Sequence, residues 1–252
     1  MSYLLYDLEF YAYRFAAGAI EDWNWGGGDW VHVCRHKDAL ITFVDHAESL
    51  LARFGGHDLF LVRGDVKNFR HDIWPDYKAN RKDRQRPPGY GQFLKGLSEY
   101  SRERGWLTGG FKNVEGDDVL GILNEPGCII VSGDKDMKTL PGQHFHDPDD
   151  GVKAVSEWEA NVAFYKQALV GDTSDNYPGC KGVGEKNKLF SSKEWLTAET
   201  EKELWALVLR AFEKAGFNEQ FAITQARCAR ILRRGEFDFE SGTPHLWEPP
   251  VL

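Results

Sequence analysis

Three short apolar runs in this chain each end close to an aspartate. The runs cover residues 3–6 before Asp7, 59–62 before Asp65 and 128–131 before Asp134. Short apolar runs bounded by glycine and charged residues are typical of buried parallel strands. Because ligands of open parallel sheets bind beyond the carboxyl ends of the strands, we expect the three aspartates to meet in one crevice.

Apolar residues at helical spacing predict helices between and after these strands. Helices are expected over about 10–17, 40–54, 92–104 and 117–123, with a further turn from 136 to 140. No strand pattern occurs between Asp65 and Glu115, and this stretch is predicted to be an exposed insertion. The alternation of strands and helices predicts an α/β fold with a mostly parallel, twisted sheet flanked by helices over residues 1–155.

Two further segments have their own patterns. Residues 22–31 are predicted to form a hairpin with aromatic arms, and packing is favoured over binding for its three tryptophans, Trp23, Trp25 and Trp30. From Ser156 the chain is helical, beginning with a capping-box pattern, and helices are expected around 203–214 and 220–233. Residues 156–252 are therefore expected to form a helical C-terminal region.

Composition sets limits on the class of protein. The 252 residues carry 31 basic and 39 acidic side chains, and 42% of them are hydrophobic, which is enough for a substantial core. The four cysteines show no zinc spacing, no leader opens the chain, and no apolar run approaches the roughly 20 residues that a membrane helix needs. We expect a reduced, cytoplasmic monomer that does not contact a membrane.

Acidic residues cluster in a few short motifs. Taken singly, each is more often a solvated loop residue or a helix cap. Together they predict a site for two Mg²⁺ ions, because such ions prefer carboxylate oxygens and a pair can activate water and stabilise a leaving oxygen. Histidine and cysteine are absent from these motifs, which argues against zinc. The candidate ligands are Asp7, Asp65, Glu115, Asp117, Asp118, Asp134, Asp136, Asp172 and Asp175.

The net charge of −8 comes from these nine carboxylates, because the rest of the chain carries 30 acidic and 31 basic side chains. Basic residues are concentrated between Lys67 and Arg86. They form either a solvated face or a set of phosphate contacts, and their position after the second strand favours phosphate contacts. Among the aromatic residues nearby, Tyr77, Tyr90 and Phe93 are equally suited to base stacking and to core packing.

A glycine turn at Gly182-Val183-Gly184 could present backbone N–H groups to phosphate. A G-x-G pattern is weak evidence alone. Its place shortly after Asp172 and Asp175 ties it to the acidic motifs.

The motifs taken together resemble the 5′ nuclease or flap endonuclease superfamily, and specifically the 5′→3′ exonucleases of bacteriophages. The resemblance rests on Tyr6-Asp7, Tyr13-Arg14, Gly64-Asp65, Phe69-Arg70, Tyr77-Lys78-Ala79-Asn80-Arg81, Glu115-Gly116-Asp117-Asp118, Gly133-Asp134-Lys135-Asp136, Gly171 through Asn176, and Gly182 through Lys186. Glu9 departs from the pattern, since many members have a small residue there, and Pro87-Pro88-Gly89 interrupts the expected arch.

The resemblance implies a PIN-like nuclease core, a helical arch over about 82–112 and a helix-hairpin-helix over about 171–190 that tracks duplex backbone and can hold K⁺. It implies one Mg²⁺ nearer Asp7, Asp65, Glu115, Asp117, Asp118 and Asp134, and a second nearer Asp136, Asp172 and Asp175, with Mn²⁺ as a substitute. Catalytic roles fall to Arg70, Lys78 and Arg81. DNA contacts fall to Lys67, Tyr77, Lys82, Arg84, Arg86, Lys181, Gly182, Gly184 and Lys186.

The expected activity is a Mg²⁺-dependent 5′→3′ exonuclease on duplex DNA with 5′ ends, nicks or flaps. Three alternatives stay open: flap cleavage as the main activity, action on RNA or RNA:DNA hybrids in the manner of an RNase H, and binding of DNA ends or branches without cutting. A non-cutting binder is expected to lack some of the acids, whereas this chain has all of them.

Overall fold

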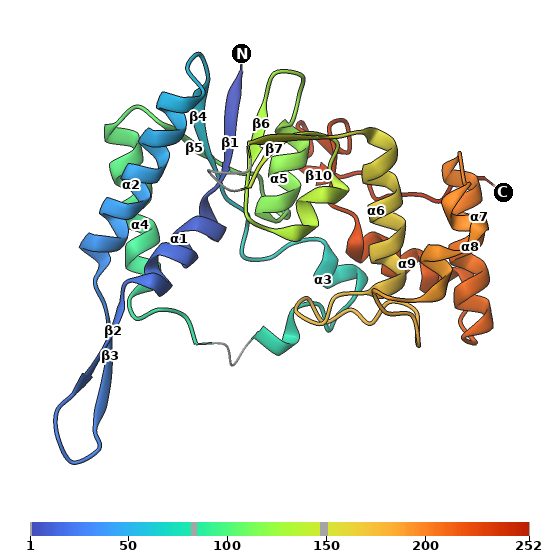
Figure 1. Cartoon of the computed structure of the whole chain (residues 1–252), viewed down its shortest axis with the longest axis horizontal. Coiled ribbons are helices and arrows are strands. Elements are labelled where there is room, and N and C mark those ends of the chain that lie inside the picture. Colours follow the sequence, from blue (N-terminus) through green and yellow to red (C-terminus); the bar gives the residue numbers. More distant parts are fainter. Residues whose placement is uncertain (1, 82–84, 147–150, 252) are drawn as a thin grey trace.

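A computed structural model describes residues 2–81, 85–146 and 151–251, and its centre is a six-stranded sheet (Figure 1). The strand order is β5-β4-β1-β6-β7-β8, and every neighbouring pair is parallel except β7 with β8. The strands are β1 (Tyr3–Asp7), β4 (Asp58–Val62), β5 (Leu107–Gly109), β6 (Ile129–Val131), β7 (Gly142–Phe145) and β8 (Val152–Val155). The prediction of a mostly parallel sheet flanked by helices is confirmed.

Side chains of β1 alternate between two apolar layers, as the pleat of a strand requires. Leu4 and Tyr6 are buried with α1 (Leu8–Gly18), α2 (His36–Arg53) and α4 (Tyr90–Glu103), whereas Leu5 is buried with α5 (Gly116–Leu123). Helices therefore cover both faces of the sheet, which is why its central strands are apolar throughout.

The helix α4 corrects the expectation of an exposed insertion. It buries Tyr90, Phe93 and Leu97 in the same apolar layer as α1 and α2. Of the two roles considered for Tyr90 and Phe93, the structure therefore shows core packing and not base stacking. Three strands, β5, β7 and β8, were not predicted, since each has only three or four residues and no clear alternation.

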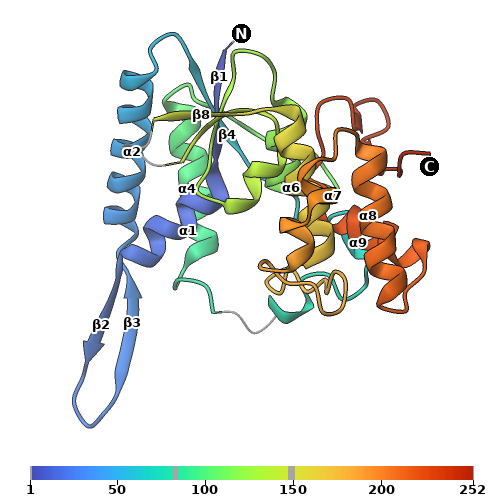
Figure 2. The same ribbon diagram turned by 45° about the vertical axis from the view of Figure 1, so that its right-hand side comes forward.

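The C-terminal helices lie together on one side of the sheet (Figure 2). They form a second apolar core. The elements are α6 (Glu157–Val170), η3 (Lys188–Ser191), α7 (Lys193–Leu196), α8 (Glu201–Lys214) and α9 (Glu219–Ala229). The capping box at Ser156 is present, with the Ser156 hydroxyl accepting the Glu159 N–H. Residues after α9 leave the helix earlier than predicted, and Ile231 and Leu232 pack beneath α5; two short strands follow, β9 (Phe237–Asp238) and β10 (Thr243–Pro244).

The predicted hairpin is present as β2 (Ile20–Asn24) and β3 (Trp30–Cys34), and it projects away from the rest of the molecule (Figures 1 and 2). Its tryptophans do not pack as expected: Trp23, Trp25 and Trp30 are 55%, 76% and 58% exposed. Across the described ranges, no helix is long and apolar enough to cross a membrane.

Candidate active site

Parallel strands bring the predicted acids to one edge of the sheet. Asp7 is the last residue of β1 and caps α1, accepting the Phe10 N–H at 3.1 Å. Its other carboxylate oxygen accepts a hydrogen bond from the Ser132 hydroxyl at 2.7 Å. Ser132 directly follows β6, and its hydroxyl oxygen accepts the Asp134 N–H at 3.1 Å. One serine therefore links the acids that end two adjacent strands.

The residues after β6 form a tight acidic turn. Asp134 caps the 3-10 helix η2 (Lys135–Thr139) and accepts the Asp136 N–H at 2.8 Å. Both aspartates follow a buried strand whose register with β1 is fixed by pairing of Tyr6 with Val131. This pairing places their backbone beside Asp7.

The electrostatics show that these acids crowd one another. Burial is the main cause that raises the pKa of Asp7 to about 6, and the charges of Glu9 and Asp134 add to it. Burial and then the charge of Asp134 raise the pKa of Asp136 to about 6. The pKa of Asp117 is well above its ordinary value because of burial and the charges of Asp7, Asp134 and Glu115. A cation among these carboxylates would relieve the repulsion.

Asp65 lies three residues beyond Val62, the last residue of the neighbouring strand β4, and is exposed. Its carboxylate accepts the backbone N–H groups of Val66 at 2.7 Å and Asn113 at 3.0 Å, which hold its pKa below the ordinary value. The adjacent Gly64 lies so close to α5 that a Cβ there would sit 2.4 Å from the Gly116 nitrogen. Only glycine allows this approach of β4 to the helix that carries Glu115 and Asp117.

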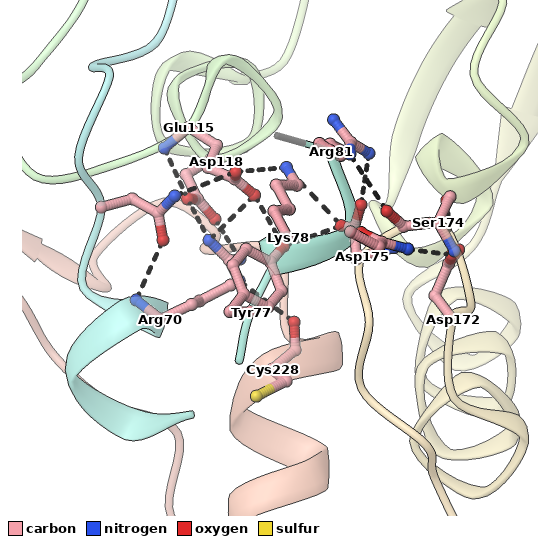
Figure 3. A network of polar contacts seen from close by, with 12 residues as sticks. Arg70, Tyr77, Lys78, Arg81, Glu115, Asp118, Asp172, Ser174, Asp175 and Cys228 are labelled. Carbon is pink, nitrogen blue, oxygen red and sulfur yellow. Dashed lines mark hydrogen bonds and ion pairs between the residues drawn. The ribbon is translucent and has the colours of Figure 1, made fainter. Parts of the chain in front are cut away.

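A second group of charged residues surrounds Glu115 and Asp175 (Figure 3). Lys78 forms an ion pair with Glu115 and lies 3.6 Å from Asp175, while Arg81 pairs with Asp175. Burial disfavours the charged forms of Glu115 and Lys78. The charges of Lys78 and Arg70 nevertheless hold the pKa of Glu115 below its ordinary value, and those of Glu115 and Asp175 hold the pKa of Lys78 above its ordinary value. Lys78 and Arg81, from the 3-10 helix η1 (Ala79–Arg81) and the residue before it, therefore lie at the acidic site.

Asp172 belongs to the loop that follows α6. Its carboxylate accepts the Ser174 and Asp175 N–H groups at 2.6 and 3.2 Å, and Lys135 lies 3.7 Å away. Although burial opposes it, a hydrogen bond from the Ser174 hydroxyl and these two backbone bonds hold the pKa of Asp172 below its ordinary value. Lys135 also lies 3.9 Å from Asp136, so it connects this loop to the acidic turn after β6.

Asp118 and Arg70 do not have the predicted roles. Asp118 is fully buried, and both of its oxygens accept hydrogen bonds from the Arg70 guanidinium at 2.7 Å. The same carboxylate accepts the backbone N–H groups of Glu115 and Leu232. Arg70, of the short helix α3 (Arg70–Ile73), also donates to the Cys228 carbonyl oxygen. The pair is a buried structural link, so Asp118 is not available to a metal ion and Arg70 is not available to substrate.

The predicted DNA contacts divide into exposed and buried groups. Tyr77 is only 3% exposed, so its ring cannot stack on a base as expected. Lys67, Arg86, Lys181 and Lys186 are exposed, as are Gly182 and Gly184, which lie in a loop between α6 and η3 rather than between two α-helices. Lys67 lies 3.5 Å from Asp72, and Arg86 lies over the Tyr90 ring. Lys82 and Arg84 lie outside the described residues.

Three residues at the site were not predicted as site residues, although Glu9 was noted as a departure from the family pattern. Ser132 joins Asp7 to Asp134, Asn68 donates to Glu115 at 3.0 Å, and Glu9 is coupled electrostatically to Arg63, Glu115 and Lys78. Ser132 and Asn68 stand within motifs already recognised, immediately before Gly133-Asp134 and Phe69-Arg70. A polar residue next to a candidate ligand is a usable signal, because ligands need partners that orient them.

The donor set suits a hard divalent cation. It consists of carboxylates without histidine or cysteine, and several of these carboxylates have pKa values raised by burial and by the charges of neighbouring acids. As the side chains stand, no three Asp, Glu, His or Cys residues in the described ranges form a group that could hold an ion. Lysine and arginine partners occupy part of the space between them, so an ion would have to displace these charges or draw the carboxylates together.

The sequence matches a known family model. Residues 9–169 match the 5'-3' exonuclease, N-terminal resolvase-like domain. The chain is 29% identical to an exonuclease of Escherichia phage T7, over 98% of this chain and 93% of that protein. It is also 29% identical to an exodeoxyribonuclease of Enterobacteria phage T3, over 98% and 92% of the two chains.

The fold is similar to that of a phage nuclease. A structure described as divalent metal ions (zinc) bound to T5 5'-exonuclease aligns with a TM-score of 0.59 at 18% identity, covering 91% of this chain and 93% of that one. A bacteriophage T5 D15 flap endonuclease in complex with DNA and metal ions aligns with a TM-score of 0.56 at 16% identity, covering 91% and 93%. At this level of identity, the similarity establishes the fold.

Proposed function

This chain belongs to the 5′-3′ exonuclease family, whose model matches residues 9–169, and we propose that it removes nucleotides from the 5′ ends of duplex DNA with the help of Mg²⁺. Its membership and its exonuclease relatives make it a hydrolytic nuclease, which cleaves phosphodiester bonds. The observation that carries the proposal is the gathering of acids beyond the carboxyl ends of β1 and β6, where Asp7, Asp134 and Asp136 lie. Asp117 of α5 is close enough that the charges of Asp7 and Asp134 add to burial in raising its pKa.

We assign the metal ligands to two groups of acids. The crowding of the acids and the Ser132 hydroxyl that contacts Asp7 support one group near the sheet edge. The contacts of Lys78 with Asp175 and of Lys135 with Asp172 support its link to the acids in the loop after α6. The proposed ligands are Asp7, Asp65, Glu115, Asp117 and Asp134 for one ion, and Asp136, Asp172 and Asp175 for the other. When bound, two Mg²⁺ or Mn²⁺ ions supply a water of lowered pKa and stabilise the leaving oxygen.

Lys78 and Arg81 act at the reacting phosphate in this proposal. In the metal-free protein, their charges are matched by Glu115 and Asp175. If cations neutralise these carboxylates, the two basic side chains become available to phosphate oxygens on the same rim. They would then stabilise charge that develops in the transition state, where such contacts are most effective.

Exposed basic residues provide the contacts to the rest of the DNA. Lys67, Arg86, Lys181 and Lys186 lie on the surface, and the turn at Gly182 has a left-handed backbone that glycine adopts readily. Contacts of this kind hold phosphates and carry no base information. We therefore expect cleavage without sequence preference and binding that weakens with salt. A K⁺ ion at this turn stays a prediction.

Flap cleavage is the second candidate activity. The support is the structural similarity to a protein described as a flap endonuclease and solved with DNA. Both activities use the same ions and differ in how the 5′ strand enters. We propose exonuclease action as the main one because the phage relatives that match the full length of this chain are exonucleases.

Digestion of end-labelled DNA tests this function. Duplex, nicked, gapped, flapped and RNA:DNA substrates are incubated with Mg²⁺, and product lengths are read over time. We expect a 5′ label to appear early in mononucleotides or very short oligomers, while a 3′ label persists in long fragments. Early loss of the 3′ label would contradict the assigned direction, and binding without any cleavage would favour the non-cutting reading.

A further inference from the structure

One hydroxyl group contacts two of the candidate ligand carboxylates at once (Figure 3). The Tyr77 hydroxyl oxygen lies 2.9 Å from Oε2 of Glu115 and 2.8 Å from Oδ2 of Asp175. Glu115 caps α5 beside the sheet, whereas Asp175 lies in the loop after α6. We propose that Tyr77 is a positioning residue that fixes Glu115 and Asp175 relative to each other for metal binding. This inference rests on the proposed function.

The tyrosine ring is held too firmly to serve only as a surface contact. It is buried in the C-terminal apolar core, with the Tyr177 ring stacked at 6.3 Å and the His71 ring edge-on at 5.7 Å. Its backbone N–H donates to the Trp74 carbonyl oxygen. The position of its hydroxyl is therefore determined by packing, as a residue that orients others requires.

The next residues attach the Asp175 loop to the same segment. The Lys78 backbone N–H donates to the Asp175 carbonyl oxygen at 2.8 Å, and this lysine has a left-handed φ of 55°. Asn80 donates to the Thr173 carbonyl oxygen at 2.7 Å, and Arg81 donates to that of Ser174 at 3.0 Å. A non-glycine residue with this backbone persists only where its surroundings over-determine it. The loop is thus fixed on the segment that carries Tyr77.

The single proton of the Tyr77 hydroxyl makes this arrangement suitable for a cation. A tyrosine hydroxyl has one proton and can donate to only one carboxylate at a time. The remaining Glu115 oxygen is occupied by Asn68 and Lys78, and the remaining Asp175 oxygen by Arg81. With both carboxylates ionised, one of the two contacts to Tyr77 lacks a proton. A cation at either carboxylate would remove that repulsion without moving the tyrosine.

Loss of the hydroxyl should therefore weaken metal binding while the fold remains. In Tyr77→Phe, Oδ2 of Asp175 keeps only Lys78, at 3.6 Å, among the contacts described here. Residues that orient metal ligands typically change metal affinity by about 10- to 100-fold when mutated. A matched control is Tyr165→Phe, because Tyr165 is also fully buried and its hydroxyl donates to a carboxylate, that of Glu201 at 3.0 Å, in the C-terminal helices.

The test is titration of the full-length protein with Mn²⁺ alone, without DNA, by calorimetry or by the electron paramagnetic resonance of free Mn²⁺. We expect wild-type protein and Tyr165→Phe to bind with equal affinity, and Tyr77→Phe to bind about 10- to 100-fold more weakly. Circular dichroism of each variant in EDTA reports the fold. Raising the Mn²⁺ concentration should restore binding to Tyr77→Phe.

Two results would overturn the positioning role. One is equal Mn²⁺ affinity of Tyr77→Phe and wild type. The other is equal weakening in both tyrosine variants, which would trace the effect to lost stability. If the wild-type protein itself binds no Mn²⁺, the proposed metal-dependent function fails instead, so the two failures can be told apart.

Discussion

Arg70 and Asp118 form a fully buried, two-pronged ion pair, with both guanidinium-to-carboxylate distances at 2.7 Å. The pair joins α5 to the C-terminal segment, because Arg70 also donates to the Cys228 carbonyl oxygen and Asp118 also accepts the Leu232 N–H. The contact turns two residues that look catalytic in sequence into structural ones.

Replacement of Arg70 is expected to lower the free energy of unfolding, and not to act directly on the chemical step. Arg70→Met leaves the Asp118 carboxylate buried without its partner, and such a loss typically lowers the free energy of unfolding by about 3–5 kcal/mol. Urea denaturation of the metal-free protein measures it. The double variant Arg70→Met with Asp118→Leu removes the unpaired charge and should recover part of the loss, since the Glu115 and Leu232 N–H groups still lose their acceptor. A single variant as stable as wild type would show that the pair contributes nothing.

Asp7 and Asp136 should make the metal-free protein less stable as pH rises from about 4 to about 7. The pKa values of Asp7 and Asp136 are raised to about 6, so these two groups bind more protons in the folded state than in the unfolded state in this window. Their favourable contribution is complete below the ordinary pKa and is lost as pH passes about 6. The pKa of His46, which burial lowers to about 4, acts in the opposite direction within this window, so the contribution of the acids is measured as the difference between wild type and a variant that lacks one of them. The lowered pKa of Asp172 also acts in that direction, as pH falls below the ordinary value of 3.8.

Thermal unfolding in EDTA across this pH range measures the effect. Asp136→Asn removes one titrating group and should flatten the slope, and Mg²⁺ should raise the melting temperature more at pH 7 than at pH 4.5, because protons compete with the metal. Equal slopes for wild type and Asp136→Asn would mean that crowding of these acids does not govern stability in this range.

Lys78→Ala and Arg81→Ala should slow the chemical step more than they weaken DNA binding. Their proposed contact is with the reacting phosphate, and loss of one such donor typically lowers the rate by about 100-fold. Single-turnover rates at saturating enzyme separate chemistry from binding. Lys95→Ala serves as the control, since Lys95 is 80% exposed and pairs weakly with Glu99 on α4. Unchanged rates in both site variants would show that Lys78 and Arg81 form a solvated face and do not act in the chemical step.

The hairpin tryptophans should contribute little to stability. Trp23 and Trp25 are more than half exposed, so replacement by serine is expected to change the free energy of unfolding by less than about 0.5 kcal/mol. Trp205→Ala, at a fully buried position, should cost about 3–5 kcal/mol. Losses above about 2 kcal/mol in the hairpin variants would show that the hairpin packs on the body of the protein.

The sequence predicts features that depend on local pattern. The apolar run that ends at Asp7 specifies both a strand and the edge at which its carboxylate lies, because parallel strands share their carboxyl ends. Asp117 and Asp118 show what a local pattern cannot predict. Successive helical residues point about 100° apart, so one faces the other acids while its neighbour faces Arg70, and the identity of that partner depends on a contact between distant segments.

Distant contacts also explain the other corrections. Tyr77 could have stacked on a base from its sequence context alone, but its burial depends on Tyr177 and the C-terminal helices. The helix α4 has a polar face that suggested exposure, and its apolar face finds a partner only when α1 and α2 are in place. The strand β5 is three residues long, which is too short for a period to be recognised.

The central claim is that the acids at the sheet edge bind the metal ions that cleavage requires. Its most direct test is the first-turnover rate of 5′-labelled duplex at saturating enzyme, measured for wild type and Asp7→Asn while Mg²⁺ is titrated from excess EDTA. We expect no cleavage in EDTA, a wild-type rate that rises to a plateau with Mg²⁺, and an Asp7→Asn rate at least about 100-fold lower at every Mg²⁺ concentration that supports wild-type cleavage. Cleavage by the wild type at an unchanged rate in EDTA, or full activity of Asp7→Asn, would contradict it.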